Sequence, residues 1–421
     1  MIQTFPLSDG ITLRCCRDTR FKQGCLSFQI VRPMSAEENA MNALLPSVLL
    51  RGTTHHPSLR SITHRLDELY GASVSAVVRR VGDYQTTGLY CGFMDDRFAL
   101  PGDQVLAPML AFLEELLLES PVENSGFLTS YVESEKKNLI ATIESELNDK
   151  RAYAMGKLLR NMCREDTFGL PRLGDTAQVS AIDPTALYAH YQKILRESPI
   201  EIFYVGSAEA ELVRSLLQPL LDRLNRNYVN LHPQTGFHTC DGADLTETME
   251  ISQGKLCMGF VTPITNRTAE FPAMQLLNTI FGSGMTSKLF MNIREKMSLC
   301  YSIGSGYYGT KGIVTVSAGI DFDKEELTRQ EVLQQLKACQ EGNITDEELT
   351  AARQAILSSL RATHDSPGSI EGYYATAALS GMKMTPAEYM AAVEAVTKEQ
   401  VVAAANSLQL HTTYFLKGVT Q

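Results

Sequence analysis

The stretch Leu276–Ile320 reads LLNTIFGSGMTSKLFMNIREKMSLCYSIGSGYYGTKGIVTVSAGI, and three kinds of structural signal follow one another in it. The first is a pair of closely spaced glycines, Gly282 and Gly284. Glycine adopts backbone angles that other residues avoid, and it lets backbone N–H groups come close to a ligand. We therefore expect a loop here that can touch the backbone of a ligand.

Apolar residues then recur at every fourth position, which predicts a helix with one buried stripe. The stripe consists of Met285, Leu289, Ile293 and Met297. After it, the apolar period drops to two, which predicts two strands. Arg294 lies near the expected helix end and Tyr301 near the start of the first strand, on either side of one turn. Taken alone, the two residues fit an ordinary surface ion pair and an ordinary sheet residue.

The run GSGMTSKLFMNIREKMSLCYSIGS, residues 282–305, resembles the C-terminal half-site of the pitrilysin and insulinase family of zinc peptidases. The resemblance implies that Arg294 and Tyr301 hold the substrate backbone beside the scissile bond. In that family the two residues face the zinc site of the other domain across a closed chamber. The similarity extends, more loosely, over nearly the whole chain.

Composition excludes several classes of partner. The 421 residues carry a net charge of −10 without a block of five like charges, which disfavours nucleic acids and anionic membranes. The first ten residues, MIQTFPLSDG, lack the basic and apolar regions of a signal peptide, and no run of 18 apolar residues occurs. Nine cysteines without a C-x-x-C pair indicate free thiols. We expect a cytoplasmic protein.

The two halves of the chain repeat one order of expected elements: two strands, two helices, two strands, several helices and a closing strand. The segment LDELYGASVSAV, residues 66–77, matches IREKMSLCYSIG, residues 293–304, in this order. An internal duplication of about 200 residues explains the repeat. We expect an α+β protein with two similar lobes, each a mainly antiparallel sheet with helices packed on one side. The expected N-terminal lobe is 1–224, the linker 225–246 and the C-terminal lobe 247–421.

The resemblance provides a test for the metal site. Active family members carry H-x-x-E-H on the helix before a K-G-T-like turn, because two histidines at i and i+4 reach one Zn²⁺ while the glutamate polarises the bound water. Counted back from Arg51, the three positions here are Ala43, Pro46 and Ser47. Alanine and proline have no ligand or base, and a neutral serine hydroxyl is a poor zinc ligand. None of the three catalytic side chains is present.

The family's third zinc ligand is a glutamate on a later helix, and the run YVESEKK at 131–137 places Glu133 at the matching position. A lone carboxylate cannot hold the metal, so we expect Glu133 to be a solvated or salt-bridged helix residue. We therefore expect no metal or other cofactor in this chain, and zinc only in a partner subunit.

Other side chains could rebuild a zinc site. His55 and His56 follow the turn, and His64 with Glu68 forms an i, i+4 pair that could reach one metal. Exposed histidines and a surface hydrogen-bonded pair are the simpler interpretation. The sequence contains no phosphate-binding glycine loop and no G-x-S-x-G elbow.

These observations favour a non-catalytic, substrate-binding subunit of a heterodimeric zinc peptidase, because some family members divide the site in this way. A homologous H-x-x-E-H subunit would supply the metal and bind the same peptide or unfolded protein. Arg294 would bind a substrate carbonyl or carboxylate, and Tyr301 the oxyanion that forms on attack. Gly282 and Gly284 would let an extended peptide approach. Among the non-catalytic members of that family, the chain resembles bacterial proteins associated with modification of elongation factor P. There, a similar subunit without the metal motif accompanies a relative that carries it.

Two other classes of function stay open. One is a peptide-binding or scaffold protein without a proteolytic role, like the structural relatives found in respiratory complexes. The other is a metallopeptidase with a rebuilt zinc site. The isolated chain can also pair with itself, since a face that meets a homologous partner can meet a second copy.

Overall fold

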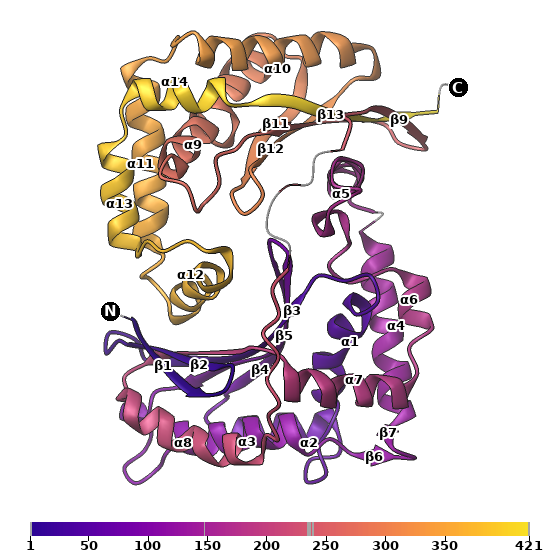
Figure 1. The fold of residues 1–421 in the computed structure, drawn as a ribbon, viewed down its shortest axis with the longest axis vertical. Coiled ribbons are helices and arrows are strands. Elements are labelled where there is room, and N and C mark those ends of the chain that lie inside the picture. The colour runs from indigo at the N-terminus through magenta and orange to yellow at the C-terminus, as the bar shows by residue number, and fades with distance from the viewer. Residues whose placement is uncertain (1, 147, 234–236, 238–239, 420–421) are drawn as a thin grey trace. The chain divides into compact units, whose positions relative to one another are not determined.

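The chain folds into two compact units (Figure 1). The computed structural model describes residues 2–146, 148–233, 237 and 240–419. Unit 1 contains three segments, Met1–Glu144, Leu170–Gln234 and His364–Thr376. Unit 2 contains the other three, Ser145–Gly169, Thr235–Thr363 and Ala377–Gln421.

The units differ from the contiguous lobes 1–224 and 247–421 that we expected, because each half of the chain gives one segment to the other unit. Within the expected linker 225–246, residues 234–236 and 238–239 lie outside the described part of the chain. All nine cysteines are free thiols, as the sequence predicted. Among the described residues, no helix is long and apolar enough to cross a membrane.

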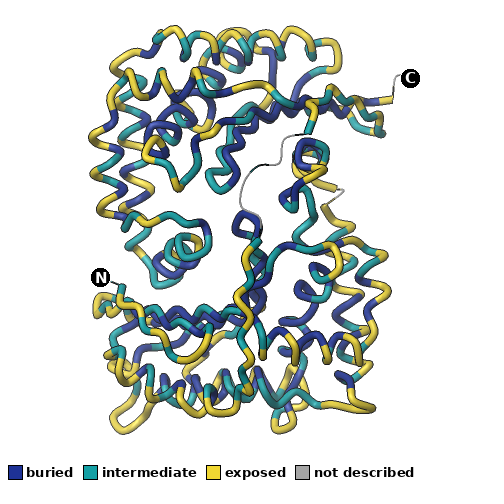
Figure 2. The backbone as a smooth tube through the Cα atoms, viewed as in Figure 1, coloured by how far each residue is buried: buried dark blue, intermediate teal, exposed yellow. Residues whose placement is uncertain are grey.

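Unit 1 is built on a six-stranded sheet in which all neighbours are antiparallel except β2 and β8. In spatial order the strands are β1 (Ile2–Ser8), β2 (Ile11–Arg17), β8 (Ile200–Gly206), β3 (Gln23–Pro33), β5 (Tyr84–Met94) and β4 (Ser73–Val81). The inward side chains of β2, β3, β5 and β8 form one core with the helices that follow. Figure 2 shows buried backbone running through the strands.

The helices of unit 1 lie mostly on one side of this sheet (Figure 1). They are α1 (Asn39–Leu49), α2 (Leu59–Glu68), α3 (Leu106–Leu118), α4 (Thr129–Ser145), α6 (Thr176–Ser180), α7 (Pro184–Glu197) and α8 (Ala210–Arg223). A short 3₁₀-helix, η1 (Asp96–Phe98), and a two-residue pair, β6 (Val122–Glu123) with β7 (Gly126–Phe127), connect them. Side-chain caps fix several starts; Asp183, for example, accepts from Thr185 N and Ala186 N.

Unit 2 is built on a five-stranded sheet that is antiparallel except for β13 and β9. In spatial order the strands are β11 (Cys300–Tyr308), β12 (Ile313–Ile320), β10 (Gly254–Val261), β13 (Gln409–Gly418) and β9 (Asp244–Met249). Every residue of β12 is buried, since both faces of this strand are covered. β11 is an edge strand.

The helices of unit 2 include two π-helices, η3 and η4. In chain order the elements are α9 (Phe271–Asn278), η3 (Thr279–Ser283), η4 (Leu289–Lys296), η5 (Phe322–Lys324), α10 (Glu325–Gln340), α11 (Asp346–Ala362), α12 (Pro367–Ser380), α13 (Pro386–Ala395) and α14 (Lys398–Asn406). Thr345, Thr385 and Thr397 start α11, α13 and α14 through capping boxes. The first ten residues of α12, 367–376, belong to unit 1.

The two sheets have the same topology, which confirms the expected pair of similar α+β lobes. The order β4-β5-β3-β8-β2 of unit 1 corresponds strand by strand to β11-β12-β10-β13-β9 of unit 2, and the one parallel pair falls at the same place. In the turns before the two edge strands, Gly71 with φ 69° and its counterpart Ser298 with φ 52° share the left-handed conformation, whereas Tyr70 has φ 61° and its counterpart Met297 has φ −93°.

Each sheet also carries one helix from the other half of the chain on its second face, which we did not predict from the sequence. In unit 2, α5 (Lys150–Met162), followed by the 3₁₀-helix η2 (Thr167–Gly169), lies against β10, β12 and β13. A Cβ on Gly259 would lie 2.6 Å from Met162 Sδ, so glycine at this position leaves room for the Met162 side chain of α5.

In unit 1, the first part of α12 lies against the sheet through a buried carboxylate. Glu371 accepts hydrogen bonds from both terminal nitrogens of Arg79 at 2.9 Å, from Ser27 Oγ at 2.7 Å and from Gln29 Nε2 at 2.8 Å. Its side chain is 1% exposed. Because α12 follows α10 and α11 as α5 follows α3 and α4, the two exchanged helices are equivalent parts of the duplication.

Candidate functional site

The helix that corresponds to the family's zinc helix is part of the hydrophobic core. Nine of the eleven residues of α1 are buried, among them Ala43 and Pro46, and Ser47 is half-buried. Leu44, Leu45, Val48 and Leu49 all belong to the core of unit 1. The three positions that would carry H-x-x-E-H therefore face packed surroundings and offer no zinc ligand.

A buried polar network holds the start of α1. Asn42 donates from Nδ2 to Gln85 Oε1 at 2.9 Å and accepts at Oδ1 from His190 Nε2 at 2.7 Å. Gln85 in turn donates to the carbonyls of Asn39 and Arg172, and Thr87 Oγ1 donates to the carbonyl of Asn42. Since buried polar groups cost free energy unless they are paired, this closed set of partners fixes α1 in one position.

His190 is the titratable member of this network. Burial lowers the pKa of its imidazole to about 4, because the charged form would lose its hydration. Asn42 Oδ1 can only accept, so the neutral ring carries its proton on Nε2. His190 thus serves the fold as an uncharged hydrogen-bond donor at neutral pH.

Glu133, the match to the third zinc ligand, lies on α4 with a half-exposed side chain. Its Oε1 is 2.8 Å from Nζ of Lys136, which is buried and also donates to the carbonyl of Ile182. Two residues further along, Arg51 Nη1 lies 3.2 Å from Oε1 of the buried Glu135. Glu133 and Glu135 are thus each paired with a cation of the protein itself.

The histidines near this helix pair separately with different carboxylates. His56 Nδ1 lies 2.7 Å from Glu115 Oε1, and His55 Nε2 lies 3.0 Å from Glu119 Oε2. His64 is 3.3 Å from Glu68 on the surface of α2. Within the described ranges, no group of three or more His, Cys, Asp or Glu side chains could hold a metal ion.

Arg294 and Tyr301 lie in a segment of unusual geometry. Arg294 belongs to the π-helix η4, which follows a second π-helix, η3, and Tyr301 is the second residue of the edge strand β11. π-Helices are rare, and they occur frequently at functional sites. Both side chains reach solvent, and Tyr301 is 62% exposed.

The predicted apolar stripe is correct at its centre and wrong at its ends. Leu289 and Ile293 are fully buried, whereas Met285 is 78% and Met297 is 40% exposed. Met285 precedes the helix, which starts at Leu289, and the wider π-turn rotates later positions away from an ideal α-helical stripe. The segment keeps apolar side chains at the surface.

The charged groups of this segment are weakly engaged. Arg294 Nε lies 3.6 Å from Oε1 of its neighbour Glu295, and its guanidinium lies 4.7 Å above the Phe290 ring. The Tyr301 hydroxyl donates to Asp321 Oδ1 at 3.1 Å. The Lys324 ammonium, and then this hydroxyl, hold the pKa of Asp321 below its usual value. Exposed pairs of this kind contribute little stability, so both side chains can exchange these partners for a ligand.

The two glycines of the segment differ. A Cβ on Gly282 would lie 2.6 Å from Leu289 Cδ1 and 2.7 Å from Ser305 Oγ, so close packing of η3 against β11 explains this glycine. Gly284 is half-buried, and its backbone is extended. Of the two, only Gly284 has exposed surface that a ligand could contact.

A cavity of about 430 Å³ lies beside the strand that carries Tyr301. One wall is the start of α5, and the other is formed by the faces of β11 and β12. It is lined by Asp149, Arg151, Ala152, Met155, Gly304, Ser305, Gly306, Tyr308, Thr315 and Ser317. Small polar residues and glycines leave room for a chain that runs along β11.

Sequence reasoning missed the polar network of α1. The signal was present, because His190 lies in phase with the buried Leu187, Tyr191 and Ile194 of α7, and a histidine on a buried helical face needs a partner. Its partner Asn42 lies 148 residues away along the chain, and Gln85, the partner of Asn42, lies 43 residues from Asn42. No local pattern in the sequence connects these residues.

Comparison with known proteins shows which family and which relatives the chain is similar to. Residues 181–356 match the family described as the peptidase M16 inactive domain. The probable inactive metalloprotease YmfF of Bacillus subtilis is 29% identical over 409 residues, which cover 97% of this chain and 96% of that protein.

Two solved structures have the same fold. A conserved protein from Enterococcus faecalis V583 superposes with a TM-score of 0.93 at 25% identity, covering 100% of this chain and 99% of that one. A peptidase M16 inactive domain from Pseudomonas fluorescens superposes with a TM-score of 0.81 at 16% identity, covering 100% and 98%. Over residues 181–356 the chain is therefore similar to the M16 inactive-domain family, the pitrilysin and insulinase type that residues 282–305 resemble, and over nearly its whole length it is similar to a probable inactive metalloprotease.

Proposed function

We propose that the chain is the substrate-binding subunit of a heterodimeric zinc peptidase, in which a homologous partner carries H-x-x-E-H and the zinc ion. The observation that carries the proposal is the contrast between Arg294 and Tyr301, which are solvent-accessible, and the buried positions 43 and 46 of α1, which have no ligand atoms. Similarity to the M16 inactive-domain family and to a probable inactive metalloprotease supports this division of roles between two subunits.

Each side chain has a separate chemical role in this proposal. The guanidinium of Arg294 donates in a fixed fork, which suits a substrate carbonyl or carboxylate. The Tyr301 hydroxyl donates to the oxyanion that develops when the partner's zinc-bound water attacks the peptide carbonyl. Its present acceptor, Asp321, keeps the hydroxyl oriented at the surface until substrate arrives.

The substrate in this proposal is an extended peptide or an unfolded protein. The cavity beside β11, about 430 Å³, has Gly304, Gly306 and small hydroxyl side chains on its sheet wall and Asp149 and Arg151 on its helix wall. The hydroxyl, carboxylate and guanidinium groups of this lining offer hydrogen-bonding partners to a peptide backbone, and the two glycines leave room for it. Gly284 lies at the surface just before η4 and would leave space for the same chain.

The test mixes the purified chain with an H-x-x-E-H homologue and follows cleavage of an unfolded protein. We expect no cleavage by this chain alone and cleavage by the mixture. Arg294→Ala or Tyr301→Phe should each lower the rate of the mixture by ~10²-fold if each removes one transition-state donor. Tyr301→Phe should act mainly on kcat, because the oxyanion exists only during reaction.

Matched controls are available in both units. Arg361→Ala removes an exposed arginine of α11, and Tyr228→Phe removes a hydroxyl that donates to Asn230 in unit 1. Neither should change the rate. Full activity of both Arg294→Ala and Tyr301→Phe would overturn the assigned roles. Partner binding without cleavage in any mixture would favour a scaffold, and one equivalent of tightly bound zinc in this chain alone would favour a rebuilt metal site.

A further inference from the structure

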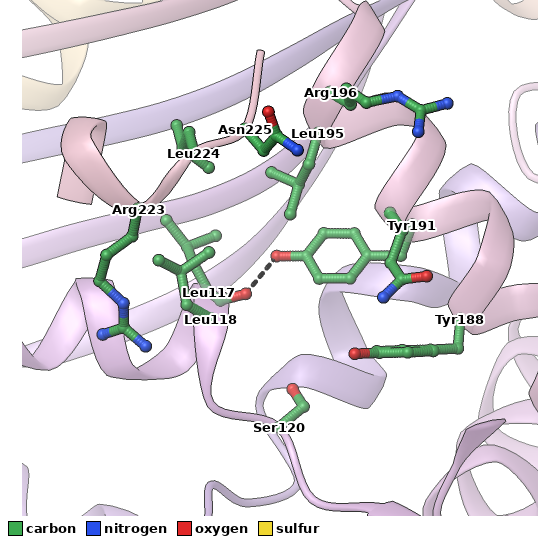
Figure 3. Close-up of a pocket in the computed structure, with 11 residues that line it drawn as sticks. Leu117, Leu118, Ser120, Tyr188, Tyr191, Leu195, Arg196, Arg223, Leu224 and Asn225 are labelled. Atoms are coloured by element: carbon green, nitrogen blue, oxygen red, sulfur yellow. Dashed lines mark hydrogen bonds between the residues drawn. The ribbon is translucent and has the colours of Figure 1, made fainter. Parts of the chain in front are cut away.

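A second cavity lies in unit 1, away from both half-sites in the sequence. It occupies about 380 Å³ where the C-terminal ends of α3, α7 and α8 meet (Figure 3). It is lined by Leu117, Leu118, Ser120, Tyr188, Tyr191, Gln192, Leu195, Arg196, Arg223, Leu224 and Asn225. Small-molecule sites in proteins have volumes of about 300–1,000 Å³, and a cavity of about 150 Å³ already holds benzene.

The floor and walls of this pocket are apolar. Leu117 and Tyr191 are buried at its base, and Leu118, Leu195 and Leu224 form its sides. The Tyr191 hydroxyl donates to the Leu117 carbonyl at 2.5 Å, so both of these polar groups already have a partner (Figure 3). What they leave exposed to the cavity is the flat face of an aromatic ring and leucine methyl groups.

Two hydroxyl groups in the pocket have no partner. Ser120 Oγ is buried and makes no hydrogen bond within the part of the chain that the structure describes. The Tyr188 ring packs edge-on against Phe127 at 5.1 Å, and its hydroxyl likewise has no hydrogen-bond partner among the described residues. Figure 3 shows both hydroxyls directed into the same space below the Tyr191 ring. The buried Ser120 hydroxyl without a partner is unfavourable, and the half-buried Tyr188 offers a second hydroxyl beside it, so this space suits a ligand with hydrogen-bonding groups.

The charges around the pocket are already balanced. Arg223 Nη1 lies 2.7 Å from Glu114 and 3.0 Å from Glu119, and Arg196 Nη2 lies 2.8 Å from Glu197. In Figure 3 both guanidinium groups point away from the cavity. No Asp, Glu, Lys or His stands among the described residues that line it. A charged ligand would lose its hydration here without gaining a counter-ion.

We propose that this pocket binds an uncharged small aromatic molecule that carries hydrogen-bonding groups. Its ring would pack on Tyr191 between the leucine side chains. Its polar substituents would pair with Ser120 Oγ and Tyr188 Oη. The site is built from residues of unit 1 alone and is independent of Arg294 and Tyr301.

The test measures binding of 4-hydroxybenzamide to the full-length chain by isothermal titration calorimetry and by ligand-detected NMR. This probe has one aromatic ring, a phenol and an amide, and it is uncharged at neutral pH. We expect a Kd of about 1 mM or tighter, as an efficient ligand of this size gives. Absence of saturable binding up to ~10 mM would overturn the proposal.

Variants separate this pocket from other sites on the chain. Ser120→Ala should weaken binding about fivefold to tenfold and leave Tm unchanged or raised, because the lost hydroxyl has no partner in the free protein. Tyr188→Phe should weaken binding to a similar extent. The control Ser215→Ala removes an exposed α8 hydroxyl that donates to the Leu212 carbonyl, and it should leave Kd unchanged.

The anion 4-hydroxybenzoate distinguishes an uncharged ligand from a charged one. It has the same ring and phenol, so we expect its Kd to be at least tenfold weaker than that of the amide. Equal or tighter binding of the anion would overturn the assignment of an uncharged ligand. Unchanged binding of the amide to both Ser120→Ala and Tyr188→Phe would place the probe elsewhere on the chain.

Discussion

The helix α1 and the segment η4–β11 are the two places where the M16 family carries its chemistry, and in this chain their surroundings are opposite. Nine of eleven residues of α1 are buried, whereas two of eight residues of η4 are. The helix α1, which corresponds to the metal half-site, packs in the hydrophobic core through its leucines and is fixed by a buried polar network. The Arg294–Tyr301 half-site keeps charged, aromatic and methionine side chains in solvent. Substitutions in α1 should therefore change stability, and those in η4–β11 should change binding.

Restoring the zinc motif should have the largest effect. The triple change Ala43→His, Pro46→Glu and Ser47→His places large polar side chains at positions that are buried or half-buried. Overpacking and unpaired polar groups each cost ~1–3 kcal/mol, so we expect a loss of more than about 4 kcal/mol. Chemical denaturation of the purified variant measures it.

The control for this triple change is Arg60→His, which forms an i, i+4 histidine pair with the exposed His64 on α2 and should change stability by less than about 0.5 kcal/mol. If the triple variant were as stable as the wild-type chain and bound one equivalent of zinc, α1 would be a dormant metal site and the comparison with η4 would fail.

Truncating one apolar side chain in each region tests the same contrast on a smaller scale. Leu45 is 1% exposed in the core of unit 1, so Leu45→Ala should cost about 2–5 kcal/mol. Met285 is 78% exposed, so Met285→Ala should cost less than about 0.5 kcal/mol. Urea denaturation of both variants gives the two values. Similar losses at the two positions would mean that Met285 packs in solution.

The pH dependence of stability should report the α1 network. His190 has a pKa of about 4 in the folded chain and an ordinary value near 6.5 when unfolded. The unfolded state therefore binds the proton more tightly, and stability falls as pH drops from about 6.5 to about 4. At pH values below about 4 the free energy of unfolding is lower by up to about 3 kcal/mol than at neutral pH. The full stability is present well above pH 6.5, where the ring is neutral in both the folded and the unfolded state.

His190→Gln removes the titrating group and should flatten the stability curve between pH 6.5 and 4. His64→Gln, at an exposed histidine of α2, should leave the slope as it is. Thermal denaturation at several pH values compares the three proteins. An unchanged slope in His190→Gln would show that the α1 network does not contain the group responsible.

The order of strands and helices could be predicted from the sequence because the same periodic pattern of apolar residues occurs in both halves of the chain. Alternating strands, the Arg294–Tyr301 turn and the altered residues 43, 46 and 47 are all local signals. The exchanged helices α5 and α12 could not be predicted, because their contacts, such as Glu371 with Ser27, join residues 344 positions apart. Met285 was misplaced because the helix starts only at Leu289, and Met297 because an α-helical period was applied to a π-helix.

The equivalent positions Gly71 and Ser298, which share a positive φ before the two edge strands, should show the smallest effect on stability. Gly71 has φ 69°, and a Cβ there would meet nothing within 4 Å, so Gly71→Ala pays only for backbone conformation, about 1 kcal/mol. Ser298 adopts φ 52° as a non-glycine residue, and Ser298→Gly should gain up to about 1 kcal/mol by removing that strain. Chemical denaturation resolves both values.

Opposite signs are expected because a positive φ favours glycine, which is present at Gly71 and absent at Ser298. If Ser298→Gly instead lost stability, the Ser298 side chain would make a favourable contact in solution, and the two turns would no longer be equivalent.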